Sequence, residues 1–307
     1  MNQKRFNIKA SDIAQYLESD LIGDSLNIDN VVALSDCKDG CLSFINKSIY
    51  QENIELIALY IVNLDKEIDK NSKASYIKVN NPRLAFAKVL SEFFSMKQEG
   101  YISFSSNISK TARIDSNVSI GEFCVIGENV LIGSNTRINN NVVIADATSI
   151  GSNCYIKSGT VIGEDGFGFD FEDDGTPIKI PHIGKVLIGD HVEIGAKCTV
   201  AKGTLSNTVI ADHVKIDDQV HIAHNCNIGK RTVIAACAEL SGSVTIGEKC
   251  WIGPNVSIKQ KLNIGNEVLL GIASTVTKNI ASKKKIMGFE SLELRELIRI
   301  KKWMGIK

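Results

Sequence analysis

The sequence is poor in aromatic residues, in proline and in net charge. Of its 307 residues only 6% are aromatic and four are proline, and 35 basic side chains balance 35 acidic ones. The balanced charge argues against a general attraction to nucleic acid, so no nucleic-acid partner is expected. No apolar run approaches the roughly 18 residues that a membrane-spanning helix needs, so no integral membrane segment is expected.

The eight cysteines form no Cys-x-x-Cys pair. Cys37 and Cys41 lie four residues apart, but no second pair or nearby histidine completes a zinc site. A disulfide framework is not expected in a chain of this size and compartment. The first residues are charged and lack the apolar stretch of a signal peptide. The sequence therefore predicts a cytoplasmic protein.

What the sequence does contain is an aliphatic residue at a fixed spacing. From Ile108 to Ile162 an isoleucine recurs at every sixth position, and the phase resumes at Ile188. After a slip of four residues around Thr204–Asn207, the repeat runs unbroken over residues 210–276. Four positions after each of the isoleucines from Ile114 to Ile156 stands a small or β-branched residue.

A period of six fits neither a helix nor the simple alternation of an amphipathic strand. It fits a short strand followed by a corner, so that three hexads close one triangular coil and coils stack at about 4.8 Å. The large aliphatic and the small residue both point into a narrow prism, where aromatic rings would not fit. The sequence thus predicts a mainly β protein with a parallel β-helix over residues 106–280. Five cysteines occupy the small inward position and are expected to be apolar fillers: Cys124, Cys154, Cys198, Cys226 and Cys250.

Residues 1–105 lack the repeat and predict a small N-terminal α/β domain. Ser11 and Asp12 are expected to cap a first helix that runs to about Glu18. A second helix is expected after Asn81 as the cap residue and Pro82 at the first helical position. Strands are expected near residues 42–45, 56–62 and 76–79.

Two further segments also depart from the hexads. A loop insert at residues 163–187 begins with alternating glycine and phenylalanine, and Phe167 and Phe169 predict a lid or an apolar channel wall. Residues 281–307 predict a short basic helical tail. That tail is expected either to pack on the last coil or to dock an acidic carrier protein.

The candidate chemistry is concentrated in His221-Ile222-Ala223-His224-Asn225. Ile222 takes an inward position, so His221 points outward and His224 falls at a corner of the coil. Histidine titrates near neutrality, which suits a general base. Glu239 lies one coil beyond His221, and Lys261, two coils beyond Asn225, is close enough to face the same groove.

The chain resembles a known family. Its hexads are similar to those of the hexapeptide-repeat acyltransferase superfamily, whose parallel β-helix is left-handed. Several segments also resemble the UDP-3-O-acylglucosamine N-acyltransferases of lipid A biosynthesis. These segments are residues 42–50, 81–87, 163–169 and 222–225.

The resemblance implies a left-handed β-helix, a uridine-binding N-terminal domain and a homotrimer. It implies that Phe44 and Tyr50 hold a uracil ring and that Asn46 supports it. It also implies that His224 is the general base and that Asp217 assists it, although Asp217 should lie near a different corner. The N–H of Gly242, one coil above His224, is the expected oxyanion donor. The other expected substrate-binding residues are Phe167, Phe169, His221 and Lys261.

The implied reaction moves a 3-hydroxyacyl chain from acyl-carrier protein to the 2-amine of UDP-3-O-acylglucosamine. The donor would be a phosphopantetheine thioester, and no separate cofactor is expected. The chain departs from the family at Ala201-Lys202-Gly203, where Asp-Arg-Gly is common, and at Lys261, where a histidine is common. Two alternatives therefore stay open. One is a paralogous N-acyltransferase for another nucleotide-linked amino sugar. The other is a non-enzymatic or zinc-binding hexapeptide protein, the latter using His213, His221 and His224 as in γ-class carbonic anhydrases.

Overall fold

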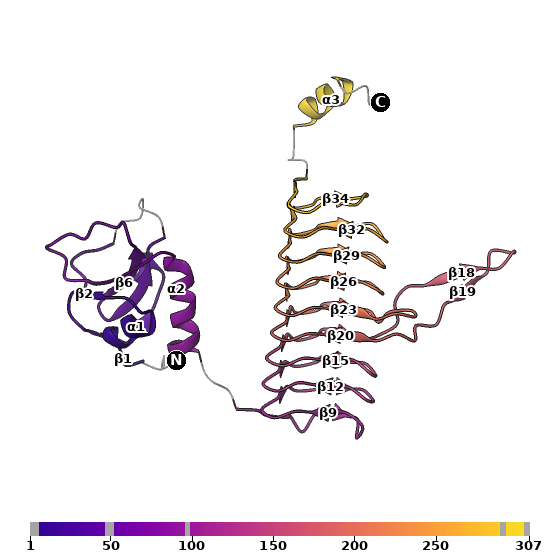
Figure 1. Cartoon of the computed structure of the whole chain (residues 1–307), viewed down its shortest axis with the longest axis horizontal. Coiled ribbons are helices and arrows are strands. Elements are labelled where there is room, and N and C mark those ends of the chain that lie inside the picture. Colours follow the sequence, from indigo (N-terminus) through magenta and orange to yellow (C-terminus); the bar gives the residue numbers. More distant parts are fainter. Residues whose placement is uncertain (1–5, 47–51, 96–98, 289–292, 304–307) are drawn as a thin grey trace. The chain divides into compact units, whose positions relative to one another are not determined.

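The molecule contains two compact units, Met1–Gln98 and Glu99–Lys307. The computed structural model describes residues 6–46, 52–95, 99–288 and 293–303 (Figure 1). The predicted mainly β fold with a parallel β-helix is confirmed. None of the helices in these ranges combines the length and apolar character needed to cross a membrane.

The β-helix within residues 99–288 consists of strands only two or three residues long, stacked into three parallel sheets (Figure 1). One sheet comprises β10 (Ser119–Ile120), β13 (Arg137–Ile138), β16 (Tyr155–Ile156), β21 (Glu193–Ile194), β24 (Lys215–Ile216), β27 (Val233–Ile234), β30 (Trp251–Ile252), β33 (Leu269–Leu270) and β35 (Lys285–Ile286). The second comprises β8 (Asn107–Ile108), β11 (Val125–Ile126), β14 (Val143–Ile144), β17 (Val161–Ile162), β22 (Thr199–Val200), β25 (His221–Ile222), β28 (Glu239–Leu240), β31 (Ser257–Ile258) and β34 (Thr275–Val276). The third comprises β9 (Arg113–Ile114), β12 (Leu131–Ile132), β15 (Ser149–Ile150), β20 (Val186–Ile188), β23 (Thr208–Ile210), β26 (Asn227–Ile228), β29 (Thr245–Ile246) and β32 (Asn263–Ile264).

The hexads fill the interior as predicted. Inward aliphatics pair with inward aliphatics one coil away, for example Ile132 with Ile150 and Ile222 with Leu240. The five inward cysteines are buried, and burial raises the pKa of the Cys226 thiol to about 11. A thiol with a raised pKa stays protonated, so these side chains act as small apolar fillers.

Each corner of the coil needs help from side chains, because its backbone leaves the sheets. Many corner residues adopt a left-handed backbone, which asparagine tolerates better than most residues. At several corners an Asn or Asp oxygen accepts the N–H of the residue one coil below. Asn140 accepts from the N–H of Glu122 at 2.8 Å, and Asp146 accepts from that of Glu128 at 2.7 Å.

The insert, expected as a loop, folds into a short antiparallel hairpin. β18 (Phe169–Phe171) pairs with β19 (Pro177–Lys179), and the hairpin projects from the stack between β17 and β20 (Figure 1). The tail contains a helix, α3 (Leu294–Trp303), within the predicted range.

The N-terminal unit is a small α/β domain. Its elements are β1 (Ile8–Lys9), α1 (Ala10–Tyr16), β2 (Leu21–Ile22), β3 (Asn27–Ile28), β4 (Asn30–Val31), the 3-10 turn η1 (Leu34–Asp36), β5 (Cys41–Phe44), β6 (Leu59–Asn63), β7 (Ser75–Val79), α2 (Pro82–Val89) and the π-turn η2 (Leu90–Phe94). A five-stranded sheet has the order β2-β7-β6-β5-β4, and β1 pairs with β3.

The two helix starts had different outcomes. Asn81 caps α2 as predicted, because its side chain accepts the N–H of Leu84 at 3.1 Å. The expected cap by Ser11 and Asp12 is wrong, since α1 begins one residue earlier. The N–H of buried Ala10 donates to the carbonyl of Leu26 at 2.9 Å, which fixes the helix start before Ser11.

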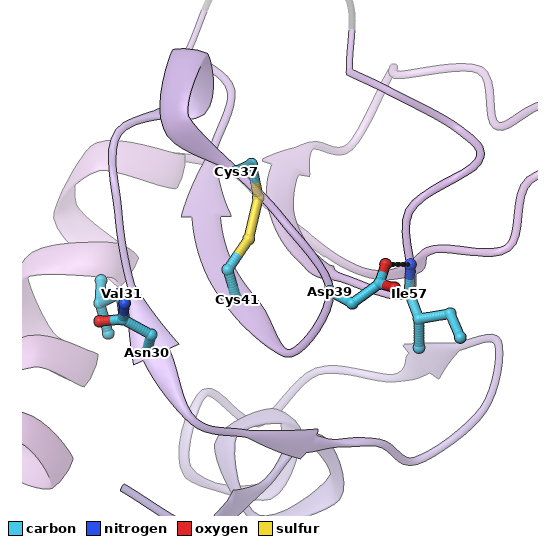
Figure 2. Close-up of a disulfide and its surroundings, with 6 residues drawn as sticks. All are labelled: Asn30, Val31, Cys37, Asp39, Cys41 and Ile57. Atoms are coloured by element: carbon cyan, nitrogen blue, oxygen red, sulfur yellow. Dashed lines mark hydrogen bonds between the residues drawn. A yellow bond between two sulfur atoms is a disulfide. The ribbon is translucent and has the colours of Figure 1, made fainter. Parts of the chain in front are cut away.

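Cys37 and Cys41 are paired, against the expectation of no disulfide framework. They form a disulfide with their Cα atoms 6.0 Å apart (Figure 2). The loop between them is held against residue 57: Asp39 accepts the N–H of Ile57 at 2.9 Å, and the N–H of Gly40 donates to its carbonyl at 2.8 Å. This fold-back brings the two sulfurs together, which sequence spacing alone does not reveal.

The disulfide predicts the thiol content of the protein. Purified protein that is denatured without a reductant should show six free thiols out of eight, because only Cys37 and Cys41 are paired. Thiol titration with Ellman's reagent measures this number, and reduction beforehand should raise it to the full complement. Eight reactive thiols before reduction would contradict the pairing.

Candidate functional site

A pocket of about 670 Å³ lies on the outward face of β22, β25 and β28 and is walled by the insert. It is lined by His221 and His224 from one coil, by Gly242 from the next, and by Phe167 and Phe169 from the insert. Glu239 lines it as well, so the structure brings together six of the residues singled out in the sequence.

The imidazole of His224 is held by the residue that follows it. Nδ1 of His224 lies 2.8 Å from Oδ1 of Asn225. The amide of Asn225 is itself oriented: its Nδ2 donates to the Ser206 carbonyl at 3.3 Å, and its Oδ1 accepts the N–H of Thr204 at 3.2 Å. Since Oδ1 only accepts, Nδ1 of neutral His224 carries the proton and Nε2 carries the lone pair.

The support for Asn225 comes from the four-residue slip in the repeat. Thr204 and Ser206 both belong to this segment, which lies one coil below Asn225. The turn is tight, because a Cβ on Gly203 would lie 1.7 Å from the carbonyl oxygen of Ser206. The four-residue slip thus supplies the residues that hold Asn225 and, through it, His224. The sequence pattern did not reveal this role.

The unprotonated edge of His224 faces Gly242. A Cβ at this glycine would lie 2.6 Å from Nε2 of His224, so a side chain there would displace the imidazole. The absence of a side chain also leaves the corner uncapped. Among the described residues, the N–H groups of His224 and Gly242 have no hydrogen-bond partner. These two donors beside a free base can stabilise a developing oxyanion.

The insert is tied to the coil by charge. Asp165 forms ion pairs with Lys179 on the hairpin and with Lys202 on the coil, the latter at 2.9 Å. Hydrogen bonds from the two lysines lower the pKa of Asp165 to about 2. Beyond this tie, Phe167 and Phe169 pack with ring centroids 5.0 Å apart, and Phe167 is largely exposed.

Sequence reasoning missed His182, at the end of the insert. Its side chain is buried, its Nδ1 lies 3.0 Å from the Ile180 carbonyl, and its ring centroid is 5.3 Å from that of His224. Burial lowers the pKa of His182 below its ordinary value. No periodic signal marks this residue, because it stands outside the hexads.

Two predicted site residues do not reach the pocket. The carboxylate of Asp217 accepts the N–H of Asp218 at 2.8 Å and makes no bond to His224. Lys261 is exposed at a corner, where its N–H donates to the Gly242 carbonyl at 2.9 Å. Gln260 lines the pocket instead, because it lies in the same column as His224 and Gly242.

The remaining candidates lie in the N-terminal unit. Phe44 packs against Phe86 with ring centroids 4.7 Å apart. Asn46 is exposed just after β5, and Tyr50 lies outside the described residues.

The zinc alternative requires three ligands, which the described residues of one subunit do not bring together. Within the described ranges, no group of three His, Cys, Asp or Glu side chains could hold a metal ion. His213, its third candidate ligand, stacks on His191 instead, with ring centroids 4.7 Å apart.

Comparisons with known proteins point in one direction. The bacterial transferase hexapeptide model (six repeats) matches residues 105–140, 130–164 and 207–242. UDP-3-O-acylglucosamine N-acyltransferases from strains of Coxiella burnetii are 35% identical over an alignment of 224 positions that covers 67% of this chain. The chain spans 66% of the length of these relatives, just under two thirds.

Solved structures agree with that result. A UDP-N-acetylglucosamine O-acyltransferase from Moraxella catarrhalis superposes with a TM-score of 0.56 at 27% identity, covering 65% of this chain and 77% of that one. A UDP-N-acetylglucosamine acyltransferase from Francisella novicida gives a TM-score of 0.54 at 26% identity, covering 67% of this chain and 74% of the other.

The ion pairs of Asp165 predict how firmly the insert is held. Asp165→Asn should speed hydrogen exchange of the amides from Gly166 to Phe171, since the tie to Lys202 is lost. The control Asp173→Asn removes the same charge from the same hairpin, where no partner is bonded. Equal exchange in both variants would contradict the tie.

The same carboxylate sets a pH window. In the folded protein the pKa of Asp165, about 2, lies below its ordinary value of 3.8. The ionised carboxylate therefore stabilises the insert fully at pH values above the ordinary pKa, and this stabilisation is lost as the pH falls through about 2. The protection factors of the insert amides, taken relative to the intrinsic exchange rate at each pH, should therefore stay constant down to about pH 3. A fall in these protection factors between about pH 5 and pH 3 would contradict the lowered pKa.

Proposed function

Because this chain belongs to the hexapeptide-repeat acyltransferase superfamily and is homologous to UDP-3-O-acylglucosamine N-acyltransferases, we propose that it is an acyltransferase for the amine of a UDP-linked amino sugar. The observation that carries the proposal is the arrangement of His224. Its Nε2 carries the lone pair next to Gly242 in the pocket, and within the described residues the N–H groups of His224 and Gly242 have no hydrogen-bond partner.

In the proposed reaction, Nε2 of His224 takes a proton from the attacking amine. The amine nitrogen bonds to the thioester carbonyl carbon, and the carbonyl oxygen becomes an oxyanion. The N–H groups of Gly242 and His224 stabilise that oxyanion. Collapse of the intermediate breaks the carbon–sulfur bond, and the imidazolium of His224 returns its proton to the leaving thiolate.

Asn225 acts in this scheme as a positioning residue. Its Oδ1 fixes the proton on Nδ1 of His224 and keeps the ring from turning. It takes no proton itself, because an amide oxygen is a poor base.

The proposed acceptor is UDP-3-O-acylglucosamine, and the proposed donor is a 3-hydroxyacyl thioester of acyl-carrier protein. Phe44, Asn46 and Tyr50 would bind the uridine, and Phe167, Phe169 and His221 would line the path of the substrates. The active unit would be a homotrimer in which a neighbouring subunit covers the exposed rings of the insert. Light scattering of the purified protein would report its mass in solution.

A second candidate is favoured by the composition of the pocket. Glu239 and Gln260 line it beside His221. The Glu239 and Gln260 side chains can hydrogen-bond to hydroxyl or amide groups of another sugar. The alternative acceptor is therefore a different nucleotide-linked amino sugar, with the same chemistry at His224.

The proposal is tested by turnover. Purified protein is offered UDP-3-O-(3-hydroxyacyl)-glucosamine with 3-hydroxyacyl carrier-protein thioesters of several lengths, and mass spectrometry follows the N-acylated product. His224→Ala should lower the rate by at least about 1,000-fold, since the base is gone. His213→Ala, a histidine outside the pocket, should keep it. If wild-type protein acylates none of a panel of UDP- and dTDP-amino sugars, the proposed function is wrong.

The positioning role of Asn225 predicts a smaller effect. Asn225→Ala should reduce kcat by roughly 10- to 100-fold, because His224 loses its fixed tautomer and orientation. Asn255→Ala is the matched control, since both asparagines adopt a left-handed backbone, with φ of 62° and 55°. A similar kcat in the two variants would show that the hydrogen bond to His224 does not matter.

A further inference from the structure

His182 has an acceptor atom without a donor. The Ile180 carbonyl can only accept, so the hydrogen bond of 3.0 Å requires a proton on Nδ1 of His182. In the neutral ring, Nε2 then carries a bare lone pair. This atom is buried and has no hydrogen-bond partner, one of three such side-chain atoms in the described part of the chain.

The bare nitrogen lies close to the ring of His224. The two rings meet edge to face, with an interplanar angle of 78°. A Cβ placed on Gly166 would lie 3.0 Å from Nε2 of His182 and also 3.0 Å from Cδ2 of His224. Nε2 of His182 and the imidazole of the base therefore border the same small space, which a side chain on residue 166 would fill.

The surroundings keep His182 neutral. Its pKa is lowered first by burial, and the charge of a protonated His224 would lower it further. Asp165 and Lys179 also face it, with opposite effects, and these two are joined in an ion pair. His182 therefore presents a neutral dipole, rather than a second cation, to the base.

An unsatisfied buried acceptor is costly in the resting protein. An apolar ring of the same shape would fill the space without that cost. A dipole that is left unpaired in the resting state, and is aimed where charge appears during reaction, is the arrangement that electrostatic stabilisation requires. In the proposed reaction, positive charge appears on His224.

We propose that His182 is a positioning residue whose bare Nε2 stabilises the imidazolium that His224 forms during acyl transfer. The inference rests on the proposed function. His182 gains and loses no proton: the amine proton passes to Nε2 of His224 and then to the leaving thiolate, while Nδ1 of His182 stays bonded to Ile180.

Two substitutions separate this role from packing. His182→Phe keeps the ring contact and removes the lone pair, so kcat should fall about tenfold or more with little change in the KM of the acceptor. Its melting temperature should equal or exceed that of the wild type, because the unsatisfied atom is gone. His182→Gln restores an acceptor and should retain kcat within about threefold of the wild type.

The kcat values and melting temperatures of the two variants distinguish the proposed role of His182 from a structural one. A wild-type kcat in His182→Phe overturns the proposal, as does a loss of kcat in both variants together with a lower melting temperature, which would mark a structural role. Nitrogen-15 NMR of the resting protein is independent of turnover: the proposal requires a protonated Nδ1 and a bare Nε2 on His182, and the opposite tautomer refutes it. Absence of turnover in the wild type would instead count against the proposed function.

Discussion

The stacking of one coil on the next by backbone hydrogen bonds is the interaction on which the structure depends. Because the strand residues of each coil bond to the coils above and below, a residue's place in the hexad fixes its neighbours, its direction and its solvent exposure. The narrow interior admits only aliphatics and small residues, and burial of the five inward cysteines meets the same requirement. Side chains with chemistry can lie only on the outward faces, at the corners or in the interruptions.

His224 is supported by the two segments that interrupt the hexapeptide repeat. The insert supplies His182 and Gly166, and the four-residue slip supplies Thr204 and Ser206. Both interruptions end beside the same coil, so two departures from regularity converge on His224. A regular corner would have a capping side chain at position 242, and with glycine there the N–H of His224 has no partner in the described part of the chain.

The hexad period predicted much of the fold and part of the candidate site. It gave the inward positions, the outward direction of His221 and the pairing of His221 with Glu239 in register. Lys261 lies two coils beyond Asn225, whereas the residue two coils beyond His224 is Gln260. The column that matters passes through His224 and Gly242 and ends at Gln260. The hydrogen bonds that hold Asn225 and the contact between His182 and His224 could not be predicted from the six-residue period. Both depend on segments whose lengths interrupt that period. The fold-back that joins Cys37 to Cys41 likewise depends on tertiary bonds to Ile57.

A stack in which every coil touches only its two neighbours does not open all at once. The end coils have a neighbour on one side only, so they should fray at a lower free energy than the middle. β22, β25 and β28 have further strands of their sheet on both sides. The pocket therefore occupies the part of the stack that opens last, and partial unfolding from either end can come and go while the geometry around His224 persists.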